Sequence, residues 1–523
     1  MRIADFSPTR GEFLSSMGAL AFSLATGGCE QIEQAIANRP TRRNIANLAS
    51  NDPILQAYRS AITQMQALPA SNPLNWISQA NIHANHCPHG NWWLLPWHSA
   101  YLVYFERICR KLSGDATFAI PYWNWTDNNT VPGVFYNNDV MNDHTDSAAG
   151  QITVSTEFVA HSVLEPIMAL TNFELFASGK SSGQQVFASY GELEGTPHNN
   201  VHGSFPGDMA YINLSPRDPI FWTHHAMLDY CWVDWQFARR NSNTSDPAWT
   251  GLTFTEFFDE NGNSVNIPVA ITPLFAIFDY QYEPSQIGNQ IDKIKAVKTK
   301  READQLKAIA QKGAPSAIPV VQSFALPTRF AVKVGASSQQ RVPAPKAAVQ
   351  AAVQAGSGER ALLTLQHVDA TAAPDAFVRV FVNAPGPVSA STPITDPHYA
   401  GSFGFFAKNG EGAPKMMMGA PGSYVVDLTD ALRRVGAADT LDVQLVAVSR
   451  PGHPGATGGV TVDGLQLAIA RLTPPRAGCP PRRSRPWPPS PPTPRPAPSS
   501  SRARRPPANA GSLRRSWRWR RCG

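Results

Sequence analysis

The chain is short of cysteine, of charged residues and of long apolar runs, and each shortage excludes a class of protein. Six cysteines in 523 residues do not make the disulfide framework of a small secreted domain. Charged residues are 16% and hydrophobic residues 42% of the chain, which is typical of a soluble globular protein with a large core. No apolar run is long enough to span a bilayer, and the length indicates more than one domain.

Histidine is also scarce, but most of it is concentrated in two short segments. The chain has 13 histidines, and eight of them form these clusters: His83, His86, His89 and His98 in the first, and His198, His202, His224 and His225 in the second. Neutral imidazole is the commonest metal ligand in proteins. No carboxylate stands at ligand spacing beside either cluster, so the pattern favours copper or zinc over magnesium or calcium.

The second cluster begins in the run "GTPHNNVHG". His198 and His202 are four residues apart, which places them on one face of a helix and lets both imidazoles reach the same ion. The run "SPRDPIFWTHHAMLDYCWVDW" follows. Its Asp218 and Pro219 predict a helix N-cap and a proline at the first helical position.

The third ligand of this cluster is either His224 or His225, because neighbouring residues on a helix point about 100° apart. We favour His225, since Asp229 follows it by one turn. A ligating imidazole usually donates its other N–H to an acceptor such as a carboxylate. The alternative is that these are ordinary buried histidines.

In the first cluster, an apolar stretch separates His89 from His98, and an amphipathic helix follows. His83 and His86 compete for the third ligand position. A single zinc ion bound by Cys87, His83, His86 and His89 is a second interpretation. Against it, no second cysteine stands nearby, and the other cluster offers a matching set of three histidines.

Six segments between about residues 74 and 236 resemble the tyrosinase and polyphenol oxidase family, whose members carry a coupled binuclear copper centre. The segments are "QANIH", "CPHGNWWLLPWH", "YFERI", "FAIPYWNW", "PHNNVH" and "DPIFWTHHAMLD". Further along, "FVRVFVN" and "HYAGSFGFF" resemble the carboxy-terminal β-domain of plant-like members. The chain is thus similar to a bacterial member with a plant-like C-terminal domain.

The resemblance implies a ligand set and a reaction. The first copper ion would be held by His83, His89 and His98, and the second by His198, His202 and His225. His86 and His224 would then be neighbours of the ligands. Cys87 stands in the C-x-H arrangement that implies a thioether to His89, the alternative being a free buried cysteine. The family uses O2 to hydroxylate monophenols and to oxidise o-diphenols to o-quinones, the chemistry of melanin formation.

Three further residues take roles from the same resemblance. Glu194 and Asn199 would hold a water that accepts the phenol proton; the alternative is that Glu194 caps a helix and Asn199 faces solvent. Ile212 falls near the position where many plant catechol oxidases place a phenylalanine above one copper ion. A smaller side chain there would admit monophenols more readily.

Composition divides the chain into five parts. Residues 1–30 resemble a degenerate twin-arginine export signal, which predicts a periplasmic or secreted protein; a short buried helix in a cytoplasmic protein is the alternative. Residues 31–290 are expected to form an α-helical catalytic domain, a four-helix bundle around the copper site. Residues 291–358 are predicted to be a charged helix and a Pro/Ala-rich linker, and residues 359–475 a β-sandwich lid. Residues 476–523 hold thirteen arginines and no acid, which predicts a disordered tail.

The resemblance also implies that the β-sandwich covers the copper pocket and keeps the enzyme latent. Phe403, Phe405 and Phe406 are candidates to plug the pocket entrance, and the alternative is that they belong to the sandwich core. Proteolysis of the linker should then raise activity.

Four functions remain open at this point. They are a monophenol and o-diphenol oxidase, a diphenol-only or aminophenol oxidase, a hemocyanin-type O2 carrier and, less well supported, a two-zinc hydrolase. The expected partners are small phenols, with no specific nucleic acid. Oligomerisation and a copper-loading helper protein are both compatible with the sequence.

Overall fold

The structure is a computed structural model, and it describes residues 39–137, 139–142, 151–283, 319–406, 408–416, 422–450 and 455–471. The predicted export signal, the charged helix that begins at residue 291 and the Arg/Pro-rich tail lie outside these residues. Among the helices that are described, none has the length and apolar character needed to cross a membrane.

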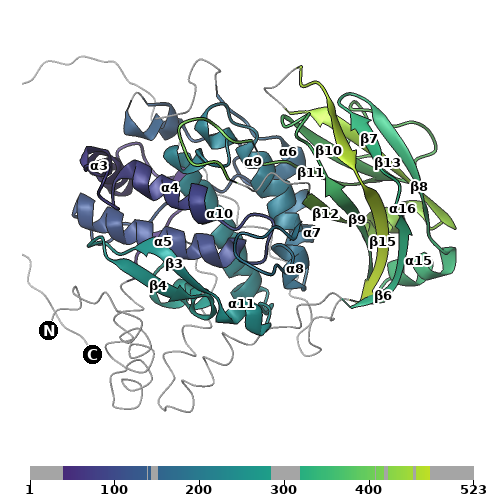
Figure 1. The fold of residues 1–523 in the computed structure, drawn as a ribbon, viewed down its shortest axis with the longest axis horizontal. Helices are drawn as coiled ribbons and strands as arrows, with labels where there is room; N and C mark the ends of the chain where they lie inside the picture. Colours follow the sequence, from purple (N-terminus) through teal and green to yellow (C-terminus); the bar gives the residue numbers. More distant parts are fainter. Residues whose placement is uncertain are drawn as a thin grey trace, which may run out of the picture. The chain divides into compact units, whose positions relative to one another are not determined.

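Four long helices form the body of the N-terminal part, residues 39–283. They are α3 (Pro53–Ala67), α4 (Trp76–His86), α5 (Leu94–Ser113) and α10 (Ile220–Val233), and Figure 1 shows them packed together. Every residue of α10 is buried, which makes it the central helix. The rings of Phe105 on α5 and Trp222 on α10 stack with their centroids 3.5 Å apart. The predicted α-helical core is confirmed.

Local sequence signals start and end these helices. Asp52 accepts a hydrogen bond from the Ile54 amide and Pro53 opens α3, while α5 ends at Gly114, whose φ of 76° suits glycine. The predicted cap before α10 is present, because the Asp218 side chain accepts from the Ile220 amide. The helix itself begins at Ile220, one residue later than the sequence predicted.

Shorter elements connect and cover the four helices. The helical ones are η2 (Ile45–Asn47), η3 (Gly133–Tyr136), η4 (Val140–Asn142), α6 (Thr156–Val159), α7 (His161–Met168), α8 (Phe173–Phe176), η6 (Glu194–His198), α9 (Asn199–His202), η7 (Asp208–Ala210), η8 (Ser215–Arg217), η9 (Asp234–Ala238), α11 (Pro247–Gly251), η10 (Val269–Leu274) and α12 (Phe275–Phe278). Strands β3 (Thr253–Phe258) and β4 (Ser264–Pro268) form an antiparallel pair, and β1 (Thr41–Arg42) pairs in parallel with β5 (Gln281–Tyr282).

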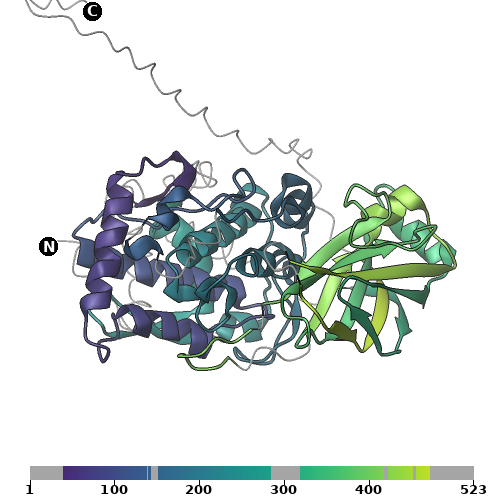
Figure 2. The same ribbon diagram turned by 90° about the horizontal axis from the view of Figure 1, so that it is seen from above.

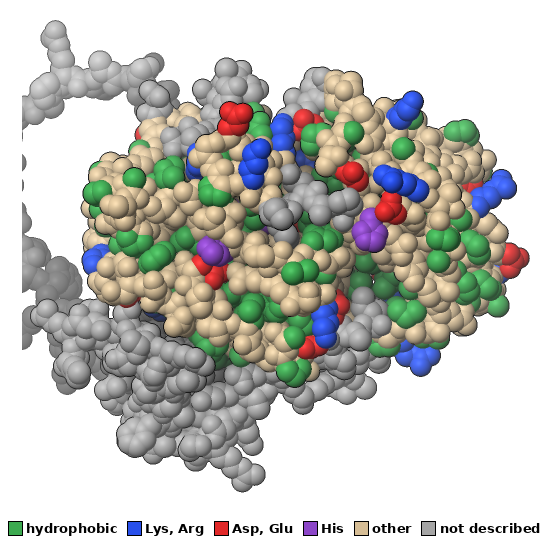
Figure 3. Space-filling view, viewed as in Figure 1, with side chains coloured by type: hydrophobic (Ala, Val, Ile, Leu, Met, Phe, Trp, Pro, Cys, Tyr) green, Lys and Arg blue, Asp and Glu red, His purple; other side chains and the backbone are tan. Residues whose placement is uncertain are grey.

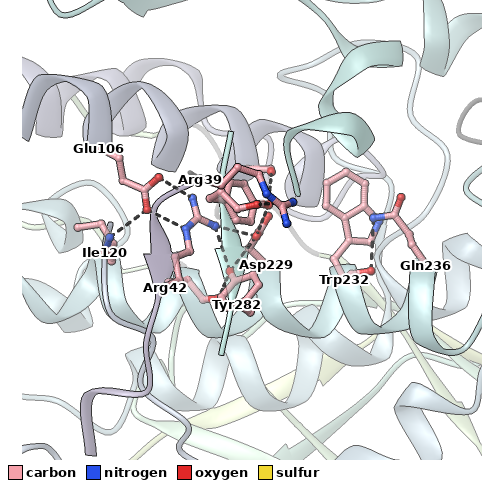
Figure 4. A network of polar contacts seen from close by, with 11 residues as sticks. Arg39, Arg42, Glu106, Ile120, Asp229, Trp232, Gln236 and Tyr282 are labelled. Atoms are coloured by element: carbon pink, nitrogen blue, oxygen red, sulfur yellow. Dashed lines mark hydrogen bonds and ion pairs between the residues drawn. The ribbon is translucent and has the colours of Figure 1, made fainter. Parts of the chain in front are cut away.

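A buried ion network centred on Arg42 ties the ends of this part to its helices (Figure 4). Arg42 on β1 donates from Nε and Nη2 to both carboxylate oxygens of Glu106 on α5, at 2.7 and 3.1 Å. Its Nη1 donates to Asp229 on α10 at 2.8 Å. The hydroxyls of Tyr280 and Tyr282 donate to the same Asp229 oxygen. The side chains of Arg42, Glu106 and Asp229 are at most 1% exposed, so these charges depend on one another.

The β-domain, residues 319–471, is built on two sheets. One has the strand order β2-β12-β9-β15-β6 and the other β11-β10-β13-β8. Their bounds are β2 (Ser189–Tyr190), β6 (Val320–Leu326), β8 (Ser337–Pro343), β9 (Glu359–Val368), β10 (Ala376–Val382), β11 (Tyr399–Gly404), β12 (Gly422–Asp427), β13 (Thr440–Ser449) and β15 (Gly464–Arg471). Helices α15 (Lys346–Val353) and α16 (Thr429–Val435) and the pair β7 (Phe330–Lys333) and β14 (Gly459–Val462) complete the domain (Figure 2).

Side chains from both sheets share one core, which makes the domain a sandwich. Leu363 on β9 and Leu467 on β15 belong to the same buried cluster as Val380 on β10 and Leu445 on β13. The predicted β-sandwich is therefore confirmed. Strand β2 lies outside the domain in sequence, yet it pairs in parallel with β12, so one sheet crosses from the N-terminal part into the β-domain.

The predicted boundary of the sandwich is wrong. The segment up to residue 358 was expected to be a linker, but residues 320–343 form β6, β7 and β8, and α15 packs against β9. The Pro, Ala and Gln content misled the prediction, because β6 and β8 are partly exposed edge strands that pair through backbone groups and need few apolar residues.

One face of the molecule carries charges of both signs. Figure 3 shows Lys, Arg, Asp and Glu side chains scattered over one face, with little histidine among them. This agrees with the low charged fraction of the chain and with the burial of the histidine clusters.

Replacement of Arg42 by alanine tests the ion network. The change leaves two buried carboxylates without their cation, so we expect the free energy of unfolding to fall by about 3–5 kcal/mol. Denaturant unfolding followed by tryptophan fluorescence measures this. The control is Arg43→Ala, because Arg43 is 34% exposed and its ion pairs should contribute about 1 kcal/mol or less. Equal losses for the two variants would contradict the role given to Arg42.

Candidate metal centre

The two histidine clusters meet in one buried site. Its six predicted ligands come from these elements: His83 from α4, His89 from the loop after α4, His98 from α5, His198 from η6, His202 from α9 and His225 from α10. Each is at most 3% exposed. His86 lies at the exposed end of α4, so the structure brings His83 and not His86 to the centre.

Contacts between the clusters are as close as those within them. The rings of His98 and His225 stack at 3.9 Å, and those of His89 and His198 lie 5.8 Å apart. Within the first cluster, the ring of His83 lies 5.1 Å from that of His89 and 5.7 Å from that of His98. The six rings therefore gather round one buried centre. Ligand atoms of His83, Cys87 and His98 lie within 4.8 Å of one another, as do those of His198, His202, His224 and His225, so His89 lies near the first group without belonging to it.

Hydrogen bonds from one ring nitrogen orient the other toward the centre. His98 Nδ1 lies 3.0 Å from the Leu94 carbonyl oxygen, and His202 Nδ1 lies 3.0 Å from the Met209 carbonyl oxygen. His198 Nδ1 lies 2.9 Å from Asn199 Oδ1, and its Nε2 has no partner among the described residues. This is how ligating imidazoles are usually held, with Nε2 left for the metal.

The local backbone contributes to this geometry. His198 is the last residue of a π-helical turn that leads directly into α9, and its ring lies 4.7 Å from that of His202. π-Helical turns inside helices often occur at functional sites. The sequence predicted one helical face for this pair, and both residues do project to one centre.

The nitrogens have the spacing that a shared ion requires. His202 Nε2 and His225 Nε2 are 3.3 Å apart. Two imidazoles bound at about 2.0–2.1 Å in a tetrahedral arrangement would have their nitrogens about 3.3 Å apart. Both nitrogens of His83, one of His89 and one of His225 also lack hydrogen-bond partners within the described part of the chain. Buried polar atoms without partners are costly, and a metal ion would satisfy one nitrogen of each ring that binds it.

Electrostatics favour the neutral imidazoles that metal binding needs. Burial lowers the pKa of His83 to about 3 and that of His198 to about 4. Burial also holds the pKa values of His89, His98, His202 and His225 well below 6.5. At neutral pH the site therefore offers lone pairs rather than positive charges.

His224 lies closer to the site than expected of a packing residue. One ligand atom from each of His198, His202, His224 and His225 falls within a set whose members are all within 4.8 Å. The 3.3 Å distance between His202 and His225 supports His225 as the third ligand, and His224 remains beside it.

Cys87 lies against two of the imidazoles. Its Sγ is 3.8 Å from His89 Nε2 and 3.7 Å from His98 Nε2, and burial raises the pKa of the thiol. The contact places the sulfur beside the ring to which the thioether was predicted, and the bond itself stays a prediction.

The predicted role of Asp229 is wrong. It was expected to accept a hydrogen bond from His225, but Asp229 Oδ2 is occupied by Arg42, Tyr280 and Tyr282, while His225 Nδ1 has no partner among the described residues. Asp229 Oδ1 also has no partner among the described residues, so the three contacts to Oδ2, rather than His225, orient this carboxylate.

Glu194 and Asn199 are both fully buried beside the centre, which excludes the alternative of a solvent-facing asparagine. Glu194 accepts from the Gly90 amide at 2.8 Å and from the Ser178 hydroxyl. Burial raises its pKa to about 8, and these two hydrogen bonds oppose the rise. Asn199 donates from Nδ2 to the Gly404 carbonyl oxygen at 3.1 Å, so the β-domain occupies its amide.

Of the three phenylalanines, Phe406 is the one at the copper pocket. Its ring stacks on His202 with centroids 3.9 Å apart and stands edge-on to His89 and His198 at 5.7 and 5.8 Å. Phe403 and Phe405 belong to the sandwich core, as their alternative interpretation stated.

Ile212 is buried under the same segment. Its amide donates to the Lys408 carbonyl oxygen at 2.9 Å, and its backbone lies near enough to His83 to oppose the lowering of that pKa. The predicted role of its side chain in access stays a prediction.

Several residues that hold the site in place were not found from the sequence. The position of Leu94 could have been predicted, since it precedes His98 by one helical turn. Met209 and Gly90 act through backbone groups that any residue could supply, and Ser178 acts through a hydroxyl that other residue types also carry. Phe221 on α10 was not among the predicted site residues. Its ring lies among the site imidazoles, 4.2 Å from His225 and 5.2 Å from His83.

Comparison with known proteins identifies the architecture. The family model for the common central domain of tyrosinase matches residues 59–166 and 155–238, and the model for the chloroplastic polyphenol oxidase C-terminal domain matches residues 330–469. Tyrosinase HcTyr1 of Hahella sp. (strain CCB-MM4) is 26% identical over 475 residues, covering 78% of this chain and 96% of the relative. Polyphenol oxidase A1 of Vicia faba is 28% identical over 280 residues, and the match covers 45% of this chain and 46% of the relative.

Solved structures agree on the fold. Latent aurone synthase from its natural source superposes with a TM-score of 0.61 at 20% identity, covering 83% of this chain and 90% of that one. Latent apple tyrosinase superposes with a TM-score of 0.57 at 22% identity, and the match covers 83% of this chain and 97% of that one. With both family models in order along the chain and the buried histidine sets within the first of them, this protein belongs to the tyrosinase and polyphenol oxidase family.

Proposed function

We propose that this protein uses O2 to hydroxylate monophenols at the ortho position and to oxidise o-diphenols to o-quinones. Membership of the family implies copper-dependent oxidation of phenols. The observation that carries the proposal is the meeting of the two histidine clusters in one buried site, with the rings of His98 and His225 stacked at 3.9 Å. Glu194 and Asn199 beside it support the hydroxylating activity.

The residues fit a binuclear copper centre. His83, His89 and His98 would hold one ion, and His198, His202 and His225 the other. When bound, the copper pair supplies the site where O2 is activated and electrons are taken from the phenol. Nitrogen-only, neutral ligands with buried unpartnered lone pairs suit copper better than a hard cation.

The rest of the chain would prepare the substrate. Phe221 lines the centre with an apolar ring 4.2 Å from His225, which helps to keep water out. A phenol with a pKa of about 10 must lose its proton to react well at neutral pH. The ionised form of Glu194, whose share grows as the pH rises toward its pKa of about 8, would accept that proton through a water held with Asn199.

Diphenol-only oxidation is the second candidate. In the structure both oxygens of Glu194 accept hydrogen bonds from protein donors, and the Asn199 amide donates to the β-domain. If these bonds persist in the active form, no water would be held there. A catechol needs less help with deprotonation, so its oxidation would be retained.

Oxygen uptake by copper-loaded protein decides between the two candidates. With the proposed activity, both a monophenol and a catechol consume O2. Glu194→Gln should then lower the monophenol rate by ~10²-fold, as for loss of a general base, and change the catechol rate far less. Copper analysis of both proteins controls for lost metal. Catechol activity alone in the wild type would support the second candidate, and uptake on neither phenol, by the uncut chain or by the chain cleaved within residues 284–318, would overturn the proposal.

The ligand assignment makes a separate prediction about metal content. Because His225 supplies one of three nitrogens to its ion, His225→Ala should reduce bound copper from about two to about one per chain. His86→Ala is the matched control, since His86 is exposed, and it should keep both ions. Elemental analysis measures the ratio. Retention of both ions in His225→Ala would refute this assignment and point to His224.

We further propose that the β-domain keeps the enzyme latent. Phe406 occupies the space over His202 that a phenol ring would need, and the strand end at Gly404 touches the ligand helix directly. A Cβ at Gly404 would overlap the Asn200 side chain, so glycine permits this approach. Cleavage within residues 284–318, which join the two described parts, should therefore raise activity.

Phe406→Ala tests this proposal in the uncut chain. Removal of the ring opens the space over His202, so we expect oxygen uptake on a catechol to rise by about tenfold or more, the factor that corresponds to roughly 1.4 kcal/mol. Phe403→Leu is the control, because Phe403 lies in the sandwich core and its loss affects stability rather than access. An unchanged rate for Phe406→Ala would count against the plug.

A further inference from the structure

One arginine of the β-domain is buried against the copper-ligand helix. Arg450 follows directly after β13 and is 4% exposed. Its guanidinium fills the space beside Gly203, the residue after the ligand His202. A Cβ at residue 203 would overlap Arg450 Nη1, so only glycine leaves room for it.

The charge of this guanidinium is poorly compensated. Among the described residues no carboxylate forms an ion pair with it, and Nε has no hydrogen-bond partner. Burial lowers the pKa of Arg450 to about 10, and attraction to Asp375 and Tyr424 opposes this only in part. A buried cation without an ion pair costs free energy. Its placement here is therefore not explained by a contribution to stability.

The same side chain reaches the backbone that carries the plug. Arg450 Nη2 donates a hydrogen bond to the carbonyl oxygen of Phe405. The next residue is Phe406, whose ring stacks on His202 with an interplanar angle of 14°. Arg450 thus contacts the end of α9 on one side and the peptide before Phe406 on the other.

We propose that Arg450 is a positioning residue that seats the Phe406 ring over His202 by joining Gly203 to the Phe405 carbonyl. The inference rests on the proposed latency, and it names the contact that holds the Phe406 ring in the blocking position. Arg450 acts through Phe406 and touches neither substrate nor metal.

Other contacts hold the β-domain in place without Arg450. Arg379 on β10 forms a two-pronged ion pair with Glu157 on α6, with both distances 2.7 Å. Strand β12 pairs with β2. Loss of Arg450 should therefore release the ring while leaving the domain docked, which separates its role from that of a general interface residue.

A double-mutant cycle in the uncut, copper-loaded chain tests the coupling. Arg450→Ala should raise catechol kcat/KM by about tenfold, the factor that corresponds to about 1.4 kcal/mol. In the Phe406→Ala background the same change should add less than about twofold, because the ring on which it acts is gone. Equal effects in both backgrounds, or no effect in either, would overturn the proposal.

Hydrogen exchange gives a readout that does not depend on activity. In metal-free protein, Arg450→Ala should speed exchange in residues 403–416 and leave residues 156–159 and 376–382 as protected as in the wild type. Faster exchange in all three segments would mean undocking of the whole domain and would overturn the positioning role. If no variant consumes O2 despite bound copper, the proposed function fails, and this exchange pattern still decides the role of Arg450.

Two further variants test whether the effect is specific to the contact between Arg450 and Gly203. Gly203→Ala places a methyl group where the guanidinium lies, so it should reproduce the exchange pattern of Arg450→Ala; wild-type protection would contradict the proposal. Arg471→Ala is the matched control, since Arg471 is on the same domain, is 65% exposed and pairs with Glu359. It should change neither kcat/KM nor exchange, and a change like that of Arg450→Ala would show that the effect is not specific.

Discussion

The structure depends on one constraint, which is the burial of imidazole nitrogens that no group in the described part of the chain satisfies. His83 has two such nitrogens and His198 and His225 have one each among the described residues. Water is excluded from them, and burial keeps the rings uncharged. A metal ion bound through one nitrogen of each ring would offset part of this cost. The helices, their caps and the aromatic shell can be understood as the means of holding these rings together.

The support for the centre is arranged in layers. Carbonyl oxygens of Leu94 and Met209 fix two rings directly. Behind them, Arg42 links β1, α5 and α10 through Glu106 and Asp229 and so fixes the helices that carry the ligands. A charged network at this depth contributes geometry more than net stability, because desolvation offsets much of the attraction.

The groups proposed for proton transfer and for substrate access lie next to each other. The Asn199 oxygen faces the ligand His198 while its amide donates to Gly404 of the β-domain. Docking of that domain therefore occupies a group that the reaction would use, in addition to placing Phe406 over His202. Two glycines, Gly203 and Gly404, let the β-domain lie close to the N-terminal part. A side chain at Gly203 would collide with Arg450, and one at Gly404 would collide with Asn200.

The sequence by itself determined the metal-ligand pattern, the helical core, the cap at Asp218 and the sandwich. These follow from local spacing and from alternation of apolar residues, which need no knowledge of distant contacts. Only the tertiary structure gave Asp229 to Arg42, selected Phe406 from three phenylalanines and extended the sandwich back to β6. Each of these depends on which residue a distant segment brings near, and competition among buried partners is settled by packing rather than by spacing along the chain.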